Sequence, residues 1–391
     1  MATQQLLFVF GTRPEAIKLA PVVLAARAHG GFDVSVCVTA QHRAMLDQVL
    51  AFFAIEPDYD LNLMKPGQSL TGLTCGVLQG LAPLLERVKQ DWMIVQGDTT
   101  TAFVASLAAF YARVKVAHVE AGLRTGNLYE PFPEELNRKL VSAIAELHFP
   151  PTEPARANLL REGIDAEHMT VTGNTGIDAL YLVRERLASD PACRALVASA
   201  LERQGLAAFI GARRPYVLVT AHRRESFGAG FESICTGIAD LCTGFPEIDF
   251  VFPVHPNPQV RGAVAQYLAP HGFANLVLCE PLDYLPFVAM MLGAALVLTD
   301  SGGVQEEAPS LGKPVVVMRD VTERTEGSAS GMVHLVGPHR RRIVATVSAL
   351  LDQRRGLQEP GAGAHAGGNY YGDGHAAQRI LDTLAVWEGA P

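Results

Sequence analysis

The sequence predicts an α/β protein with two Rossmann-like, doubly wound parallel-sheet domains. Short apolar runs rich in β-branched residues alternate with helical stretches along most of the chain. This alternation stops between residues 171 and 214, where the sequence is helical and partly charged, and then begins again. Continuous apolar strands joined by helices are typical of parallel sheets covered on both faces. With 391 residues, 49% of them hydrophobic, the chain is long enough for two domains with full cores.

Five strands are expected in each half of the chain. They cover residues 6–10, 34–39, 92–96, 115–119 and 146–149 in the first half, and residues 216–220, 249–253, 275–278, 296–299 and 314–317 in the second. We expect residues 1–172 to form an N-terminal domain, joined by a C-terminal helix at about 374–391, and residues 173–373 to form a C-terminal domain. Ligands of doubly wound sheets bind outside the carboxyl ends of the strands, so a ligand cleft is expected between the domains.

Composition and charge argue against several classes of protein. The formal net charge of −8 disfavours a general nucleic-acid binder. No apolar run is long enough to span a bilayer, and the N-terminus lacks the basic start and long apolar stretch of a secretory signal. The six cysteines are scattered without a C-x-x-C pair, as is typical of small core residues in a reducing cytosol, and no metal-ligand spacing occurs. We therefore expect a cytoplasmic protein that binds no metal, membrane or nucleic acid.

The first motif, residues 10–18, joins a predicted buried strand to a predicted helix. Thr12 and Glu15 fit a capping box, and Pro14 suits a first helical turn. Arg13 and Lys18 are two cations near the positive end of the helix dipole, which is unfavourable unless an anion lies between them. Backbone N–H groups, dipole and cations together predict a phosphate or diphosphate site. The alternative is a pair of solvated surface cations.

Three carboxylates follow successive elements of the first domain. Asp98 comes after the strand at 92–96, Glu120 directly follows the strand at 115–119, and Glu134 stands in a first helical turn after a proline. Helix capping could explain Asp98, and the helix dipole could explain Glu134, whereas strands disfavour Glu120. Together the three suit proton transfer on both faces of a small substrate. Clustered carboxylates would also raise one another's pKa, as a general acid requires.

A strand–turn–helix at residues 299–308 of the second domain predicts another anion site. Gly302 and Gly303 let the backbone approach a ligand after Ser301, and the new helix points its N–H groups at it. Glu307, one turn into the helix, could accept hydrogen bonds from both ribose hydroxyls, as the acidic residue of dinucleotide folds does. The alternative is a tight turn followed by a surface glutamate.

Further ionisable and aromatic residues of the second domain are candidates for an anionic ligand. His222 and Arg223 follow the strand at 216–220, and Arg324 follows another strand. His255 is a weaker candidate between prolines. Phe287 could stack on a base or could equally be a core aromatic.

These motifs resemble those of the bacterial non-hydrolysing UDP-N-acetylglucosamine 2-epimerases. The resemblance extends over nearly the whole chain and rests on residues 10–18, 39–43, 97–101, 118–125, 131–135, 173–175, 222–226, 299–312 and 371–374. It implies a GT-B-like arrangement of two Rossmann-like domains. It also implies a cytoplasmic homodimer that interconverts UDP-GlcNAc and UDP-ManNAc without metal or nicotinamide. The product would feed surface polysaccharide synthesis.

The resemblance also implies a role for each candidate residue. The catalytic set would be Asp98, Glu120, Glu134 and His222. The substrate would be bound by Arg13, Lys18, Leu282, Phe287, Ser301, Gly302, Gly303, Glu307 and Arg324, with the uracil near Leu282 and Phe287 and the ribose on Glu307. The expected reaction is elimination of UDP to 2-acetamidoglucal followed by re-addition with inversion at C2.

Some members of the family bind a second UDP-GlcNAc as an activator. The matching positions are Gln41, His42, Gln68, Arg223 and His255. This chain has Gly67 where some members have arginine, and it has Thr325 and Tyr370 where the family usually has proline. The two lost prolines predict changes in loop order before changes in chemistry.

Three alternatives share the predicted nucleotide site. A GT-B glycosyltransferase would pass the sugar to an acceptor, and a hydrolysing epimerase would release free ManNAc. A nucleotide-sugar sensor would bind without reacting, and only the carboxylates argue against it. A Rossmann dehydrogenase is disfavoured, because residues 11–15 lack the G-x-G-x-x-G turn.

Overall fold

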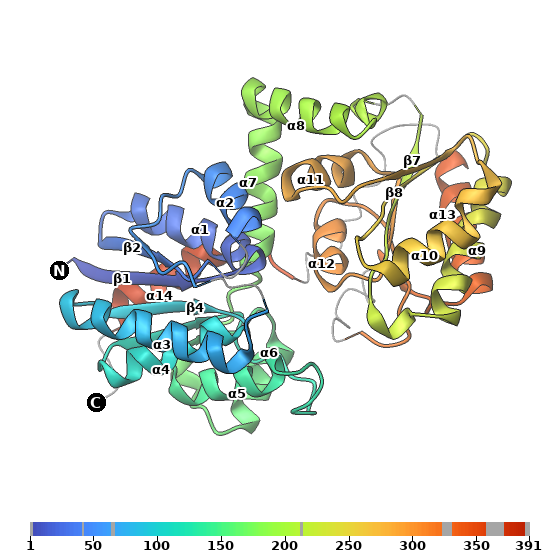
Figure 1. The fold of residues 1–391 in the computed structure, drawn as a ribbon. Helices are drawn as coiled ribbons and strands as arrows, with labels where there is room; N and C mark the ends of the chain where they lie inside the picture. Colours follow the sequence, from blue (N-terminus) through green and yellow to red (C-terminus); the bar gives the residue numbers. More distant parts are fainter. Residues whose placement is uncertain are drawn as a thin grey trace. The chain divides into compact units, whose positions relative to one another are not determined.

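The protein folds into two compact units, each built around a parallel sheet (Figure 1). The computed structural model describes residues 3–40, 43–63, 67–211, 214–322, 331–356 and 371–387. Unit 1 comprises Met1–Tyr181 with Tyr371–Pro391, and unit 2 comprises Leu182–Tyr370. No helix within the described ranges is both long and apolar enough to cross a bilayer.

The sheet of unit 1 has six parallel strands in the order β3-β2-β1-β4-β5-β6. Its strands are β1 (Gln4–Phe10), β2 (Phe32–Val38), β3 (Tyr59–Asp60), β4 (Trp92–Gln96), β5 (Lys115–Val119) and β6 (Leu147–Phe149). The chain winds outward through β2 and β3 on one side of β1 and through β5 and β6 on the other side of β4. The strand order therefore reverses between β1 and β4, and this switch point is where doubly wound sheets bind ligands.

Helices cover both faces of this sheet, as the continuously buried strands require. On one side α3 and α5 flank α4, and on the other α1 packs on α2 and α14 (Figure 1). The helices of unit 1 are α1 (Arg13–His29), α2 (Arg43–Phe53), α3 (Leu70–Arg87), α4 (Thr100–Tyr111), α5 (Glu134–Ile144), α6 (Glu153–Arg161), the 3₁₀ turn η1 (Ala166–His168), the first half of α7 (Thr175–Ser189), and α14 (Ala376–Val386).

Unit 2 repeats this architecture with the strand order β12-β11-β10-β7-β8-β9, again all parallel. Its strands are β7 (Tyr216–Thr220), β8 (Asp249–Pro253), β9 (Leu276–Cys279), β10 (Leu296–Thr299), β11 (Val315–Val317) and β12 (Val333–Leu335). Its switch point lies between β7 and β10. Both sheets thus offer an equivalent place for a ligand at the carboxyl ends of their central strands.

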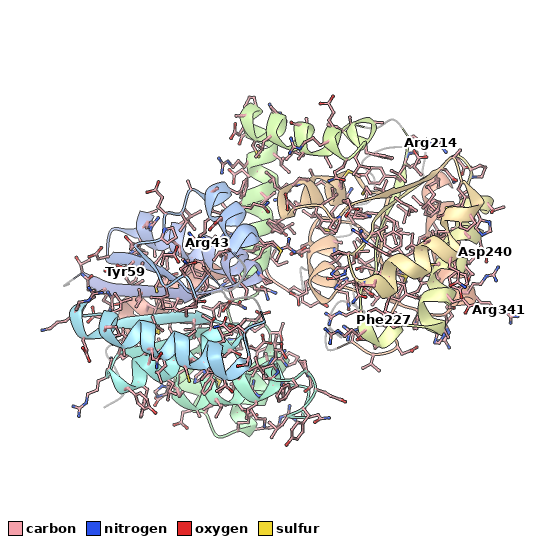
Figure 2. The ribbon with its side chains drawn as sticks, in the orientation of Figure 1. Arg43, Tyr59, Arg214, Phe227, Asp240 and Arg341 are labelled. Carbon is pink, nitrogen blue, oxygen red and sulfur yellow. The ribbon has the colours of Figure 1, made fainter. Side chains whose placement is uncertain are left out.

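The helices of unit 2 pack on this sheet and on one another. They are α8 (Pro191–Arg203), η2 (Ala207–Phe209), η3 (Arg224–Ser226), α9 (Ala229–Gly244), α10 (Pro258–Tyr267), η4 (Ala269–His271), α11 (Tyr284–Gly293), α12 (Gly302–Ser310) and α13 (Arg340–Gly356). Asp240 on α9 (Figure 2) accepts hydrogen bonds of 2.6 and 2.7 Å from Arg340, the first residue of α13. This ion pair links the two helices at the surface, while Phe231 of α9 and Ile343 of α13 both belong to the hydrophobic core.

All ten predicted strands are present, and five have the predicted bounds: 92–96, 115–119, 216–220, 249–253 and 296–299. The sequence missed β3 and β12, which have two and three residues. Both lie at the edge of their sheet, where a strand has one neighbour and little side-chain pattern to reveal it. The predicted fold class, two parallel sheets with helices on both faces, is confirmed.

Two buried histidines lie side by side on neighbouring strands of the unit 1 sheet. His118 on β5 is paired in register with His148 on β6, and both side chains are almost wholly buried. Burial lowers the pKa of His118 to about 4, although the hydrogen bond to the carbonyl of Gly97 opposes the shift. Burial and then the charge of His118 lower the pKa of His148 to about 3. Both imidazoles are therefore neutral in the folded protein at neutral pH.

We predict that unit 1 loses stability on mild acidification, because these two histidines bind protons in the unfolded chain but not in the folded unit. The loss should begin near the unfolded histidine pKa of 6.5 and continue down to about 4 for His118 and about 3 for His148. Each histidine contributes a slope of about 1.4 kcal/mol per pH unit in its window. Urea unfolding followed by tryptophan fluorescence reports on unit 1, since Trp92 and Trp387 both belong to it.

The variant His148→Gln should flatten this slope, because it removes one of the two groups. His29→Gln replaces an exposed histidine of the same unit and is the matched control. An equal slope in the native protein, His148→Gln and His29→Gln would contradict the assignment.

Candidate active site

The predicted site residues follow the strands on either side of each switch point. In unit 1, Arg13 and Lys18 lie on α1 after β1, and Asp98 and Glu120 follow β4 and β5. Glu134 is the first residue of α5. These positions are at the carboxyl ends of neighbouring parallel strands, so the sheet brings them to one edge.

The turn between β1 and α1 is organised by a residue that the sequence identified only as a cap. Glu15 completes the predicted capping box with Thr12, and it is 1% exposed. Its Oε2 accepts from the backbone N–H of Gly11 (3.0 Å) and of Thr12 (2.8 Å) and from the Thr12 hydroxyl (2.8 Å). Its Oε1 accepts from the hydroxyl of Thr99 (2.6 Å), which caps α4. Glu15 therefore fastens the loop after β1 to the loop after β4.

Burial raises the pKa of Glu15, and the four hydrogen bonds oppose this shift. The turn is also sterically tight, because a Cβ on Gly11 would lie 2.0 Å from the hydroxyl oxygen of Thr39. Glycine is therefore needed where the ends of β1 and β2 approach each other.

Glu120 has an unusual backbone conformation, and two side chains bind its carboxylate. Its φ of 62° is in the left-handed region, which few non-glycine residues adopt and which is often retained at functional sites. The amine of Lys18 lies 2.6 and 2.5 Å from its two carboxylate oxygens. The amide of Gln96, the last residue of β4, donates to the same carboxylate. The sequence predicted a phosphate or diphosphate near Lys18, and in the structure its amine is paired with the carboxylate of Glu120.

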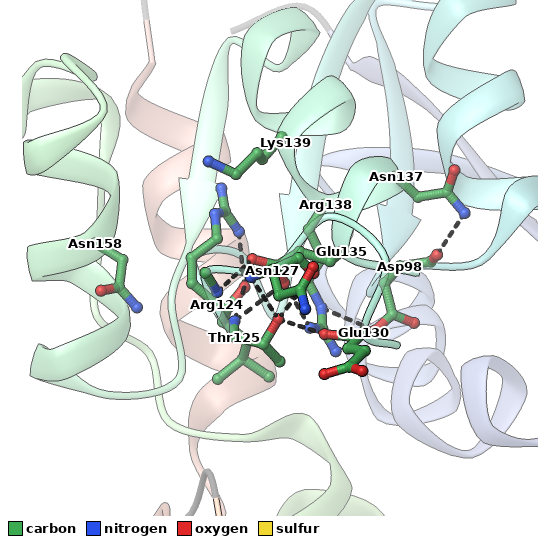
Figure 3. A network of polar contacts seen from close by, with 12 residues as sticks. Asp98, Arg124, Thr125, Asn127, Glu130, Glu135, Asn137, Arg138, Lys139 and Asn158 are labelled. Atoms are coloured by element: carbon green, nitrogen blue, oxygen red, sulfur yellow. Dashed lines mark hydrogen bonds and ion pairs between the residues drawn. The ribbon is translucent and has the colours of Figure 1, made fainter. Parts of the chain in front are cut away.

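Asp98 is bound by residues of α5 and does not cap a helix. The N-cap of α4 is Thr99, whose hydroxyl accepts from Ala102 N at 3.0 Å, so the capping alternative for Asp98 is wrong. Arg138 on α5 binds Oδ2 of Asp98 through Nη2 (2.7 Å) and Nε (3.0 Å) (Figure 3). The amide of Asn137 donates to the Asp98 backbone carbonyl at 2.9 Å.

Glu134 differs from the other two carboxylates because no cation among the described residues pairs with it. Its side chain is half-buried, and among the described residues none forms a hydrogen bond or ion pair with it. It precedes Arg138 by four residues, so both lie on one face of α5. Glu134 therefore faces the same side of the helix as the residue that binds Asp98.

In unit 2, Asp300 holds the loop that carries His222. Asp300 is fully buried at the end of β10, and its Oδ2 accepts from the backbone N–H of His222 (2.7 Å) and of Arg223 (2.8 Å). Its Oδ1 lies 3.2 Å from Nδ1 of His222. The ring of His255 stacks on that of His222 with centroids 5.4 Å apart. Burial lowers the pKa of His222, and the carboxylate of Asp300 opposes this shift.

The predicted strand–turn–helix of unit 2 is present. Ser301 is the N-cap of α12, and Gly302 is its first residue. The Ser301 N–H donates to the hydroxyl of Thr299 at 2.9 Å. Gly303 is exposed, and a Cβ built on it would meet no described atom within 4 Å, so this glycine leaves room for a ligand beside the first turn of α12. Glu307 lies one turn further on, and both burial and its charge raise the pKa of Tyr284 well above the usual tyrosine range.

The other predicted residues are placed as follows. Leu282 is half-buried before α11, Phe287 is half-buried on α11, and Gln68 is half-buried before α3. The remaining positions lie outside the described residues: Gln41, His42, Arg324, Thr325 and Tyr370.

The sequence missed the supporting residues Glu15, Gln96, Arg138 and Asp300 as parts of the site. Asp300 follows its strand directly, as Glu120 does, and this position was a usable signal. Gln96 and Arg138 gave little signal, because a polar strand end and an arginine on an exposed helix are common.

Comparisons with known proteins give one consistent result. Residues 24–385 match the family model described as UDP-N-acetylglucosamine 2-epimerase. The enzyme of that name from Yersinia pestis is 54% identical over 380 residues, which are 97% of this chain and 98% of that protein. The Neisseria meningitidis UDP-GlcNAc 2-epimerase, in a crystal structure bound to UDP-GlcNAc, is 46% identical with a TM-score of 0.85, over 97% of this chain and 99% of that one. The Methanocaldococcus jannaschii enzyme, crystallised with UDP-GlcNAc and UDP, is 30% identical with a TM-score of 0.77, over 98% and 100% of the two chains.

Two doubly wound parallel sheets, each with polar residues at its switch point, define a GT-B-like α/β protein, as predicted. The chain belongs to the UDP-N-acetylglucosamine 2-epimerase family. The family resemblance and the enzyme class, an isomerase, are therefore confirmed.

We predict that Asp300 sets the tautomer of His222. A carboxylate only accepts hydrogen bonds, so in the native protein the proton of the neutral imidazole belongs on Nδ1. In Asp300→Asn the amide oxygen must serve the two backbone N–H groups, and the NH₂ group then faces Nδ1. The proton should therefore move to Nε2, which ¹⁵N NMR of the labelled imidazole measures.

A second aspartate–histidine pair of unit 2 provides the control. Asp320 lies 2.8 Å from Nε2 of His339, with side chains 60% and 50% exposed. Asp320→Asn should leave the His222 resonances unchanged. The same His222 tautomer in the native protein and in Asp300→Asn would contradict the prediction.

Proposed function

We propose that this protein catalyses the reversible epimerisation of UDP-N-acetylglucosamine at C2, giving UDP-N-acetylmannosamine. The observation that carries the proposal is the set of carboxylates Asp98, Glu120 and Glu134 at the carboxyl edge of the unit 1 sheet. Two of them are held by cations at 2.5 to 3.0 Å, so their carboxylates are fixed in position. The UDP-GlcNAc found in the related Neisseria meningitidis structure supports the choice of substrate.

The proposed reaction is an elimination followed by re-addition. The C2 proton of the sugar is not acidic enough for direct removal, whereas cleavage of the C1–O bond makes C1 cationic and acidifies C2–H. UDP leaves with the electron pair of the C1–O bond, a carboxylate then takes the C2 proton, and the electrons of the C2–H bond form the C1=C2 double bond of 2-acetamidoglucal. Re-addition of UDP to C1 with protonation at the opposite face of C2 inverts that centre. No electrons are gained or lost overall.

We assign the departing UDP to the cations and helix N-termini of the site. Arg13 and the start of α1 in unit 1, and Ser301, Gly302 and Gly303 in unit 2, supply the donors that stabilise an anion as its charge develops. Glu307 would accept from the ribose hydroxyls and Phe287 would bound the uracil. Arg324 would add a further cation, and His222 would contact the diphosphate or the sugar.

Three finer expectations accompany this proposal. We propose a homodimer in the cytoplasm that supplies a precursor of surface polysaccharide. Binding of a second UDP-GlcNAc as activator stays a prediction for Gln41, His42, Gln68, Arg223 and His255. Gly67, which stands where some members of the family have arginine, removes a cation from that region and predicts weak activation at most.

The product formed from UDP-GlcNAc alone separates the proposal from its alternatives. In deuterated water, an epimerase should give UDP-ManNAc with deuterium at C2, as measured by proton NMR. A glycosyltransferase would leave the substrate unchanged without an acceptor, and a hydrolysing epimerase would release free ManNAc and UDP. Either of these results would contradict the proposed function.

We predict that Asp98→Asn, Glu120→Gln and Glu134→Gln each lower kcat by a factor of about 10² or more, because each removes a proton carrier. UDP affinity, measured by calorimetry, should change less than about threefold, since none of the three is assigned to the nucleotide. Glu153→Gln replaces an exposed glutamate of α6 in the same unit and should retain native turnover. Native turnover in all three variants would remove these carboxylates from the mechanism.

A further inference from the structure

Arg138 lies between two carboxylates of unit 1 and binds both. Its Nε and Nη2 bind Oδ2 of Asp98 at 3.0 and 2.7 Å, while its Nη1 donates to Oε2 of Glu135 at 2.9 Å (Figure 3). Its side chain is only 16% exposed. Burial lowers the pKa of Arg138, but Asp98 and Glu135 outweigh this effect, and the net shift is upward.

Glu135 is a fixed anchor for this guanidinium. It is fully buried, and both of its oxygens accept from the backbone N–H of Thr125, at 3.1 Å each. Its Oε1 also accepts from Gly126 N at 3.0 Å. Thr125 in turn donates through its hydroxyl to the carbonyl of Glu130 at 2.5 Å. Because Glu135 is fastened to the loop that precedes α5, the position of Arg138 is set from outside the site.

Both contacts of Arg138 with Asp98 use the same carboxylate oxygen. Oδ2 is occupied twice, the backbone carbonyl of Asp98 is held by Asn137, and no described residue binds Oδ1. This arrangement leaves one oxygen of Asp98 in a defined orientation and ready to accept a proton.

We propose that Arg138 is a positioning residue for Asp98, and that it presents Oδ1 of this carboxylate to the sugar. The proposal rests on the function proposed above, in which Asp98 carries a proton. Proton transfer depends steeply on geometry, and a displacement of about 1 Å can cost about 10² in rate. A planar guanidinium can bind two carboxylates at once, whereas a lysine amine is a point charge that cannot reproduce the fork.

A purely structural role is the alternative, because Arg138 also joins α5 to the loop at 124–130. The two roles differ in one respect. A positioning residue acts through Asp98, so its loss should cost little once Asp98 can no longer carry a proton. Loss of a purely structural residue should lower kcat by the same factor whether or not that carboxylate is present.

The test is a double-mutant cycle of Arg138→Met and Asp98→Asn, with turnover measured as C2 deuterium incorporation from UDP-GlcNAc in deuterated water. In the native background Arg138→Met should lower kcat by about 10², with KM changed less than about threefold. In the Asp98→Asn background the same substitution should cost less than about threefold. Long incubations make the slow variants measurable.

Two further variants control for folding and for loss of charge. Lys139→Met removes the neighbouring cation, which pairs with Glu162 at 3.1 Å away from Asp98, and it should retain native turnover. Arg138→Lys preserves the charge and should recover part of the rate, remaining about tenfold below native. If Arg138→Met does not fold, as judged by tryptophan fluorescence, Arg138→Lys is used in the cycle in its place.

Several outcomes would overturn the proposal. One is a native kcat in Arg138→Met or in Arg138→Lys. Another is that Arg138→Met lowers kcat by the same factor in the native protein and in Asp98→Asn. These outcomes are distinct from failure of the proposed function, which would show as no epimer formed by the native protein. A native enzyme that epimerises while Arg138→Met matches Lys139→Met contradicts the role of Arg138 alone.

Discussion

The site in unit 1 depends on one constraint, which is that a carboxylate removed from water must be given donors. Doubly wound sheets bring several loops to the carboxyl edge of the central strands, and in this protein those loops carry Glu15, Asp98 and Glu120. Each of the three meets the constraint differently: Glu15 with backbone N–H and hydroxyl groups, Asp98 with Arg138, and Glu120 with Lys18 and Gln96. The loops after β1, β4 and β5 are thereby tied to one another and to α5. Acidic side chains that would repel one another are thus held in one place.

The same principle recurs in unit 2 with a different outcome. Asp300 ends β10 as Glu120 follows β5, but its partners are the backbone N–H groups of His222 and Arg223. The carboxylate therefore shapes a loop and lies 3.2 Å from the imidazole of His222, and no described atom fills the space beside Gly303 on the neighbouring α12. Because the partners differ, the two units present different chemical groups at their strand ends. In the proposed function, unit 1 supplies the carboxylates for proton transfer and unit 2 supplies the N–H groups for a phosphate.

Much of the fold could be predicted because its signals are local. A run such as Trp92–Gln96 is buried on both faces, and it is bounded by Asp91 before it and by the glycine Gly97 after it. The edge strands β3 and β12 were missed because pairing along one side, and not a sequence pattern, makes them strands. The strand orders could not be predicted from the sequence, because the alternation of strands and helices does not determine on which side of β1 each new strand is added.

The sequence by itself determined the residue types at the strand ends: carboxylates after β4 and β5, a capping box with two cations after β1, and a serine with two glycines after β10. These signals are short-range, because a cap or a turn involves residues a few positions apart. Only the tertiary structure decided the partners. Lys18 and Glu120 are 102 residues apart in the chain, and Asp98 and Arg138 are 40 apart. Such pairs form because the sheet places distant loops at one edge, and no local pattern encodes that proximity.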